Sequence, residues 1–332
     1  MQVIIVNPNQ AGQRLDKFLH KCLPQAGTGF LYKMLRKKNI TLNGKKAEGS
    51  EQLSVGDSIK FFLSDETFQK FSCSFVETDE YRKVYQQLKD TEILYEDDNI
   101  ILASKAAGVL TQKAKADDFS LNEWFIGYLL ENNKISAMQL STFRPSVCNR
   151  LDRNTSGIVL CGKSLAGSQY LSRCIRERRI GKFYHTVCVG NIQKEMTVEG
   201  YLHKDEVKNK VTVTASSNNE EADYIKTRYI PLCSNGGYTL LEVELITGKT
   251  HQIRAHLASL GTPVIGDYKY GDRKVNDSLK REYHLQHQLL HAYRIEFPED
   301  KDEIGHKVSS KSIVAPYPKQ FNKIVKALNL QS

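Results

Sequence analysis

The sequence contains no apolar run that approaches the roughly 20 residues needed to cross a bilayer as a helix. Its first ten residues, MQVIIVNPNQ, hold neither a basic leader nor a long apolar segment of the kind that directs export. These absences predict a cytoplasmic protein without a membrane partner. The 332 residues are 40% hydrophobic, which is enough for a packed core and for two domains.

Paired cysteines are also missing. The seven cysteines are odd in number, widely scattered and never spaced as C-x-x-C, which argues against a disulfide framework and against a zinc ribbon. The sequence has no dinucleotide-binding glycine fingerprint, no cluster of metal ligands, no internal repeat and no low-complexity segment. It therefore predicts reduced cysteines, no cofactor and no metal.

Basic residues, in contrast, are in excess. The formal net charge is +9, and residues 1–63 hold ten Lys and Arg against four Asp and Glu, a net +6. A basic N-terminal module favours a polyanion partner, most simply nucleic acid. The alternative is an ordinary soluble surface, because both signs of charge are common on any domain.

Residues 12–63 predict a helix, a loop, a second helix and then short strands around the turns at 43–44 and 56–57. In the second helix Leu31, Met34 and Leu35 share one face, while basic residues lie off it. Such a helix can rest on a core and face phosphates. The predicted nucleic-acid contacts of this segment are Lys33, Arg36, Lys37, Lys38 and Lys45.

Changes in composition divide the chain into two domains. Residues 1–75 form the basic N-terminal domain, the polar stretch 76–91 is the predicted linker, and residues 92–328 form the second domain. In the second domain, strand-like runs flank the acidic turn at 96–98, and LNEWFIGYLLENN predicts a helix with Trp124, Tyr128 and Leu129 facing inward. Further strand-like and helical runs follow, so we expect an α+β fold with one mixed sheet and flanking helices.

The stretch GIVLCGKS, residues 157–164, matches the phosphate-loop pattern G-x-x-x-x-G-K-S/T and would make the chain a nucleotide hydrolase. A phosphate loop needs a buried strand before its first glycine and a flexible loop after it. Here the order is reversed, because polar residues precede Gly157 and four apolar residues follow it. We therefore expect a strand inside the match, then a helix capped by Ser164, and no nucleotide cofactor.

The stretch NRLDRNTSG, residues 149–157, places Asp152 between two arginines and ahead of an apolar run. One interpretation is a capping aspartate at a turn before a strand. The same tripeptide occurs at residues 14–16, where Asp16 is typical of the first turn of a helix. The alternative interpretation, that Asp152 is a chemical group, depends on the stretches around it.

Three further stretches bear on that choice. In TGKTHQIRAHLASLGTPVIGDYKYG, residues 247–271, Thr250 can cap a helix that has Ile253, Leu257 and Leu260 on its inner face and ends at Gly261. Arg254 lies in the first turn of that helix, where it could equally be solvated, and His251 and His256 could serve in packing or capping. RRIGKFYHTVCVG puts Tyr184 on a strand, where core packing is the simpler interpretation. In LLHA, His291 is predicted to be structural.

Together these stretches resemble the RluA-type RNA pseudouridine synthases. The family pattern H-R-L-D-x-x-T-S-G is met at 150–152 and 155–157, its K-x-Y at 182 and 184, its T-G-R-T-H-Q-I-R-x-H-L over 247–257, and its L-H-A over 290–292. The N-terminal pattern resembles the small αL RNA-binding domain named after ribosomal small-subunit protein four. The chain departs from the family at Asn149, Lys249 and Ala106, where the family has His, Arg and Pro.

The resemblance implies a pseudouridine synthase fold with a mixed, largely antiparallel sheet, and a cofactor-free enzyme that isomerises uridine in RNA. Asp152 would be the nucleophile, Arg254 its ion-pair partner, and Tyr184 a residue that stacks on the flipped base and is a candidate for proton transfer. Arg150 would fill the gap left by the base. The predicted phosphate contacts beside the site are Arg173, Arg176, Arg178, Arg179 and Lys182.

The expected substrate is large-subunit ribosomal RNA, with transfer RNA as the alternative, and we expect a monomer. A rival hypothesis is a non-catalytic RNA-binding or ribosome-assembly factor of the same fold. Asp152, Tyr184 and Arg254 weigh against that rival, because all three catalytic residue types are present.

Overall fold

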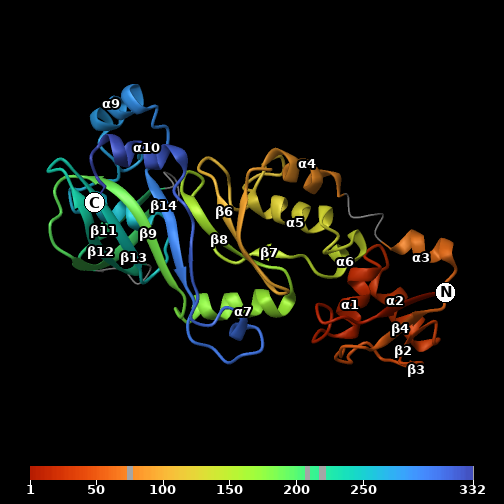
Figure 1. Cartoon of the computed structure of the whole chain (residues 1–332). Coiled ribbons are helices and arrows are strands. Elements are labelled where there is room, and N and C mark those ends of the chain that lie inside the picture. Colours follow the sequence, from red (N-terminus) through yellow and green to blue (C-terminus); the bar gives the residue numbers. More distant parts are fainter. Residues whose placement is uncertain (73–77, 206–209, 217–221, 332) are drawn as a thin grey trace.

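The computed structural model describes residues 1–72, 78–205, 210–216 and 222–331. Figure 1 shows an elongated molecule, with a small N-terminal unit at one end and a larger body built on a long twisted sheet. Among the described residues, no helix is long and apolar enough to cross a membrane.

Residues 1–72 form a unit with its own core. Its four-stranded sheet has the order β1-β4-β2-β3 and is covered by short helices. The predicted helix, loop, helix and strands are present. Asn43 and Gly44 have φ values of 52° and 74°, as a two-residue type I′ hairpin turn requires. The elements are α1 (Leu15–Cys22), α2 (Thr28–Arg36), α3 (Asp65–Phe71), β1 (Gln2–Ile5), β2 (Ile40–Leu42), β3 (Lys45–Lys46) and β4 (Ser58–Phe61).

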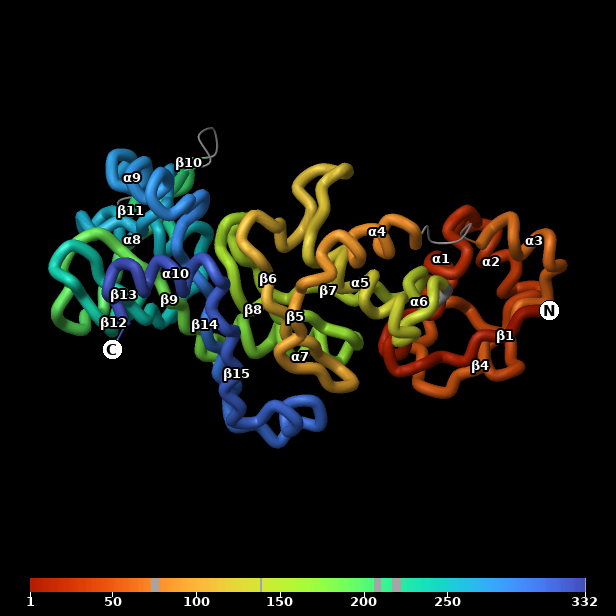
Figure 2. Tube along the Cα trace, turned by 45° about the horizontal axis from the view of Figure 1, so that its top comes forward, coloured from red at the N-terminus to blue at the C-terminus, as the bar shows by residue number. Residues whose placement is uncertain are grey.

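The N-terminal unit is attached to the larger body by polar contacts from the loop after β1. Gln10 is buried and its Nε2 donates to Thr142 Oγ1 at 3.0 Å, at the end of helix α6 (Ala137–Thr142). Asn9 Oδ1 accepts the backbone N–H of Leu165 at 3.0 Å, the first residue of helix α7 (Leu165–Arg176). In both views α6 lies beside α1 (Figure 1, Figure 2).

The predicted linker differs from the structure over residues 79–87, which form helix α4 (Asp79–Gln87). This helix packs against α5 (Leu121–Glu131), and Val84 is completely buried. The two helices approach so closely that a Cβ on Gly127 would lie 2.2 Å from the carbonyl oxygen of Tyr81. The helix was not predicted because its apolar stripe, formed by positions 81, 84, 85 and 88, is interspersed with charged residues.

The larger body is a mixed sheet of eleven strands within the described residues, with the main order β11-β10-β12-β13-β9-β14-β8-β6-β5. The pair β14–β8 is parallel and the other described pairs are antiparallel, so the predicted α+β fold with a mixed, largely antiparallel sheet is confirmed. The strands are β5 (Glu92–Glu96), β6 (Ile100–Lys105), β7 (Ser146–Val147), β8 (Ser156–Gly162), β9 (Gly181–Val189), β10 (Met196–Asp205), β11 (Lys210–Thr214), β12 (Asp223–Ser234), β13 (Tyr238–Leu245), β14 (Leu290–Glu296) and β15 (Ser312–Val314). The remaining helices are α8 (Gln252–Ser259), α9 (Arg273–Tyr283), α10 (Lys319–Ala327) and the 3-10 turn η1 (Gly305–Lys307).

The stretch that matches a phosphate loop is a buried strand followed by a helix, as predicted. Every residue of β8 is buried, and Ser164 Oγ caps α7 by accepting the backbone N–H of Gly167 at 2.9 Å. Lys163 Nζ donates to Glu96 Oε1 and to the carbonyl oxygen of Asp97, both at 2.6 Å. The lysine therefore holds the acidic turn between β5 and β6 rather than facing an anion site.

Helix α8 differs from the prediction at its N-cap and in the position of Leu260. Thr250 does not cap it; His251 takes the N-cap position with a left-handed φ of 57° and makes no side-chain cap. Leu260 lies just after the last helical residue and is 39% exposed, whereas Gly261 ends the helix with a φ of 75° as predicted. All side chains from 252 to 257 are buried, polar ones included, because α8 is packed on more than one side. Its polar residues must therefore find partners inside the protein.

Candidate active site

The loop that carries Asp152 is fixed by hydrogen bonds to its backbone. Thr111 Oγ1 donates to the carbonyl oxygen of Leu151 at 2.8 Å and accepts the N–H of the same residue at 3.1 Å. Lys105, which is 1% exposed, donates from Nζ to the carbonyl oxygen of Arg153 at 3.0 Å and to that of Val109 at 2.7 Å. Burial lowers the pKa of Lys105 to about 7, although the charge of Asp152 opposes this. These bonds hold the backbone on both sides of Asp152, so its carboxylate points in one direction.

Asn149, which replaces the histidine of the family pattern, belongs to the same scaffold. Its Oδ1 accepts the backbone N–H of Leu160 on β8 at 2.8 Å. The side chain therefore ties the start of the loop to the buried strand, and its neighbour Arg150 is left exposed at the pocket.

Asp152 forms an ion pair with Arg254 of α8, at 2.7 Å between Oδ2 and Nη1. The carboxylate side chain is 23% exposed and the arginine 8%. The other two nitrogen positions of the guanidinium bind a second carboxylate, Asp267: Nε lies 2.7 Å from its Oδ2, and Nη2 lies 2.9 Å from its Oδ1. Asp267 is 1% exposed, so Arg254 joins a buried carboxylate to one that faces the pocket.

The charges of this group are fixed by one another. Burial alone would raise the pKa of Asp267, but its bonds to Arg254 and to the backbone N–H groups of Lys269 and Tyr270 lower it. Burial disfavours the charge of Arg254, yet the two carboxylates raise its pKa above the usual range. The guanidinium is neutralised by Asp267, and the remaining negative charge of the group is carried by Asp152 on the pocket side. Sequence reasoning missed Asp267, although an acid inside the apolar stretch VIGDYKYG is a signal for a buried partner.

Tyr184 of β9 lies on the same pocket and is 8% exposed. Burial raises the pKa of its hydroxyl, and the charge of Asp152 raises it further. The hydroxyl therefore stays protonated at neutral pH, and the ring offers an apolar surface beside a charged carboxylate. The prediction of core packing is also correct, because the body of the ring contacts the main apolar cluster.

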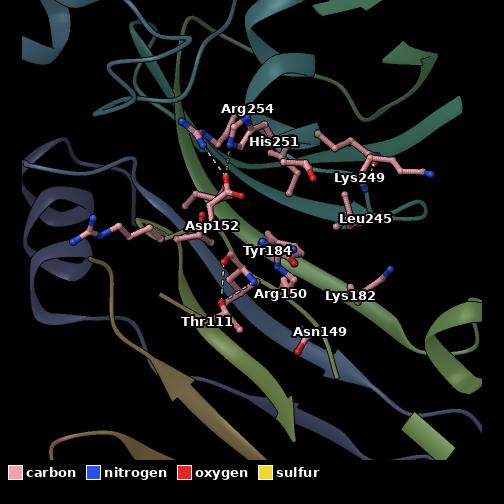
Figure 3. Close-up of a pocket in the computed structure, with 18 of the residues that line it drawn as sticks. Thr111, Asn149, Arg150, Asp152, Lys182, Tyr184, Leu245, Lys249, His251 and Arg254 are labelled. Atoms are coloured by element: carbon pink, nitrogen blue, oxygen red, sulfur yellow. Dashed lines mark hydrogen bonds and ion pairs between the residues drawn. The ribbon is translucent and has the colours of Figure 1, made fainter. Parts of the chain in front are cut away.

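The pocket has a volume of about 650 Å³ and receives side chains from several distant segments. Figure 3 shows Asp152 from the loop before β8, Tyr184 from β9, and His251 and Arg254 from the start of α8 around one space. Lys182 and Arg150 line it as well. Burial lowers the pKa of Lys182, and the positive charge of Arg178 lowers it further.

The structure does not bring all predicted phosphate contacts to the pocket. Arg173 pairs with Asp302 at 2.7 Å and Arg179 with Asp300 at 2.8 Å, so two of the four arginines are held by the segment between β14 and β15. The other two predicted contacts, Arg176 and Arg178, are exposed where α7 ends, outside the pocket lining. The basic set of the N-terminal unit is exposed too and lies on a separate surface; it comprises Lys33, Arg36, Lys37, Lys38 and Lys45.

Two other residues take structural positions. Asp16 lies in the first turn of α1, as predicted, where it accepts hydrogen bonds from Arg14 at 2.7 Å and Tyr32 at 3.0 Å, outside the pocket. His291 is completely buried between Ser156 Oγ at 2.8 Å and the carbonyl oxygen of Ala315 at 3.2 Å. Within the described residues, no group of three His, Cys, Asp or Glu side chains could hold a metal ion.

Comparisons with known proteins agree on one family. The family described as RNA pseudouridylate synthase matches residues 99–259. The chain is 27% identical over 329 residues to ribosomal large subunit pseudouridine synthase C of Vibrio vulnificus, covering 99% of this chain and 96% of that protein. It is 30% identical to the synthase C of Rickettsia bellii, covering 97% of this chain and all of that one. The solved structure of human RNA pseudouridylate synthase domain containing 4 shares the fold, with a TM-score of 0.59 at 20% identity over 76% of this chain and 97% of that chain.

Proposed function

The chain belongs to the RNA pseudouridylate synthase family, and from that premise we propose that it isomerises uridine in large-subunit ribosomal RNA with Asp152 as its nucleophile. One observation carries the proposal: the carboxylate of Asp152 lies in a pocket beside Tyr184 and pairs with Arg254, whose guanidinium also binds the buried carboxylate of Asp267. The names of the relatives support ribosomal RNA as the substrate.

The reaction needs only groups that line this pocket. It breaks the bond from the sugar carbon C1′ to N1 of the base, turns the base, and joins C1′ to C5; the proton on C5 is lost and N1 gains one. No electrons and no group donor enter. Asp152 can open this route by attacking the sugar, by attacking the base, or by helping to deprotonate the sugar, and each begins with an ionised carboxylate. Arg254 keeps it ionised beneath a bound base.

The target base must leave its stack before it can react, at a cost of a few kcal/mol. Stacking on an aromatic ring such as Tyr184 returns roughly 1–3 kcal/mol. We assign Arg150 to the gap that the base leaves, and Lys182 to a phosphate beside it. Arg176 and Arg178 would contact phosphates further along, outside the pocket.

The N-terminal unit would add affinity rather than chemistry. Its exposed cations can reach phosphates, whereas its only copy of the R-L-D tripeptide has Asp16 engaged with Arg14 and Tyr32. We propose that this unit binds RNA next to the target, and that the enzyme acts in the cytoplasm as a monomer without a nucleotide.

Two matched substitutions test the role of Asp152. Asp152→Asn keeps the size of the side chain and removes its charge, so we expect a folded protein that binds RNA and forms no detectable pseudouridine. Asp16→Asn makes the same chemical change in the same tripeptide, and should cost a fraction of a kcal/mol in stability and leave the activity intact. Pseudouridine would be measured on extracted ribosomal RNA, with folding checked by circular dichroism. Near wild-type turnover by folded Asp152→Asn would return Asp152 to a capping role.

Mapping pseudouridine across total RNA identifies the substrate. In cells that lack the gene, we expect the loss of specific sites in large-subunit ribosomal RNA. Loss confined to transfer RNA would replace the proposed substrate, and loss of no site would favour the non-catalytic RNA-binding factor.

A further inference from the structure

His251 lies beside Asp152 in the pocket, and the mechanism above gives it no task. Its Nε2 lies 4.0 Å from Oδ2 of Asp152, the same oxygen that Arg254 contacts. The side chain is 12% exposed and lines the pocket (Figure 3). Its backbone is left-handed, with a φ of 57° and a ψ of 15°, which is uncommon for a residue other than glycine. The fold therefore holds the ring at this place in a strained conformation, a pattern found at functional sites.

A chain of hydrogen bonds fixes which nitrogen of His251 carries the proton. Tyr270 Oη accepts the backbone N–H of Val211 at 3.0 Å and lies 2.9 Å from His251 Nδ1. If Nδ1 carried the hydrogen, Nε2 would present a lone pair to the carboxylate of Asp152, which is repulsive. With Tyr270 donating to Nδ1, Nε2 carries the hydrogen and points it toward the carboxylate side of the pocket. The electrostatics thus select the Nε2–H tautomer.

The surroundings also keep the ring neutral. Burial lowers the pKa of His251 below its usual range; Asp152 opposes this, while Arg254 and Lys269 lower the pKa further. A protonated ring would place a second cation on the oxygen that Arg254 already contacts. A neutral Nε2–H is therefore a hydrogen-bond donor that does not compete for the charge of Asp152.

We propose that His251 is a further catalytic residue, whose neutral Nε2–H donates a hydrogen bond to the uracil ring once its bond to the sugar has broken. This inference rests on the proposed function. When the C1′–N1 bond breaks, its electron pair goes to the base; on the routes that leave the ring intact, the base becomes an anion with its charge shared among N1, O2 and O4. A preorganised neutral donor lowers the energy of such an anion without transferring its proton. The hydrogen remains on Nε2, the base joins C1′ through C5, and the proton lost from C5 balances the one that N1 gains.

Tyr270 is then a positioning residue that acts through His251. Tyr270 is not itself among the residues that line the pocket, and it contacts the lining residue His251 through its hydroxyl, which sets the tautomer of that histidine. Removing the hydroxyl should lower the rate of pseudouridine formation only while His251 is present. A purely structural role of Tyr270 would not predict this dependence on His251.

Chemical rescue provides the test. Glycine adopts a φ of 57° without strain, so His251→Gly removes the ring and keeps the backbone. With large-subunit ribosomal RNA from cells lacking the gene, we expect the single-turnover rate to fall on the order of 100-fold, as when one oxyanion donor is removed, and the RNA dissociation constant to stay unchanged. Added imidazole, which carries an N–H, should restore part of the rate, and 1-methylimidazole, which has none, should not.

The outcomes separate this inference from the function on which it rests. If the wild-type enzyme forms no pseudouridine on this RNA, the proposed function fails. If the wild-type enzyme is active and His251→Gly matches it, or if 1-methylimidazole rescues as well as imidazole, His251 is not the donor. Tyr270→Phe gives a second variant with the ring preserved: its effect should vanish in the His251→Gly background, and additive effects of the two substitutions would also overturn the inference.

Discussion

Asp267→Asn is the substitution whose consequence follows most directly from the geometry of the site. Oδ1 of Asp267 accepts three donors, from the backbone of Lys269 at 2.9 Å and Tyr270 at 3.2 Å and from Arg254 Nη2 at 2.9 Å. Oδ2 accepts Arg254 Nε, at 2.7 Å. An asparagine has one oxygen, which must take the position with three donors. Its amide nitrogen then faces Nε, donor against donor, and neither orientation of the amide avoids such a clash.

The magnitude follows from these contacts. A hydrogen bond to a charged group contributes roughly 1.5–3 kcal/mol, and a buried donor left without a partner costs roughly 1–3 kcal/mol. We therefore expect the free energy of unfolding to fall by about 3 kcal/mol, within the range for breaking a buried pair. Arg254 should also turn away from Asp152, and if the same energy is lost from the transition state the rate falls about 150-fold.

The assay is urea unfolding together with single-turnover pseudouridine formation. Asp277→Asn is the matched control, because Asp277 is 52% exposed on α9 and its pair with Arg273 spans 3.9 Å; its effect should stay within about 0.5 kcal/mol. Stability and rate of Asp267→Asn equal to those of this control would refute the reasoning.

The pH dependence of the free energy of unfolding gives an independent test of the role of Asp267. The folded pKa of Asp267 is lowered, so its stabilisation is complete above the unfolded carboxyl pKa of about 3.9 and is lost as the pH falls through the folded value. The wild-type protein should therefore lose stability in acid more steeply than Asp267→Asn.

Two further substitutions test the fold and the RNA surface. Gly157→Ala should destabilise the protein by more than about 3 kcal/mol, because a Cβ there would lie 2.2 Å from a carbonyl oxygen of β14. In the control, Gly236→Ala, the added Cβ meets nothing within 4 Å, so this variant should lose only the stability that the positive φ costs. Equal melting temperatures of the two variants in thermal unfolding would contradict the close approach at Gly157. Replacing three exposed cations of the N-terminal unit with glutamine should reduce the slope of log affinity against log salt by roughly 0.7–0.9 for each lost phosphate contact. RNA binding would be measured between low and moderate salt. An unchanged slope would show that these residues do not contact the RNA. The three cations are Lys33, Lys37 and Lys45.

Local patterns in the sequence predicted those parts of the fold that local forces decide. The sequence predicted the apolar strand β8, the cap at Ser164 and the helix around Trp124, because each depends on residues close together in the chain. Helix α4 was not predicted, because six of its nine residues are charged or polar and its apolar stripe is buried only through packing against α5. Leu260 was misplaced because the helix stops one residue before it.

The candidate site was predicted through its family pattern, and its supporting contacts were not. Asp152, Tyr184 and Arg254 do meet in one pocket. Asp267 and Tyr270 follow Arg254 at 13 and 16 positions along the chain, and their contacts depend on the turn after α8 folding back over it, which no periodicity reveals. His251 looked like a capping or packing residue, and its left-handed backbone, which aims the ring at Asp152, is a property of the tertiary structure.

The parallel pair β8–β14 has a consequence for the order in which the protein matures. The segment next to Asp152 is anchored by Ser156 to His291 and by Thr155 to Gln288, contacts that join positions 135 and 133 apart in sequence. During synthesis the N-terminal unit can close its own core from residues 6–63 long before these partners emerge. The loop that carries Asp152, in contrast, can take its final position only when almost the whole chain has been made, and such non-local pairing forms slowly. If the N-terminal unit binds RNA as we propose, a nascent chain would hold RNA before it is able to modify it.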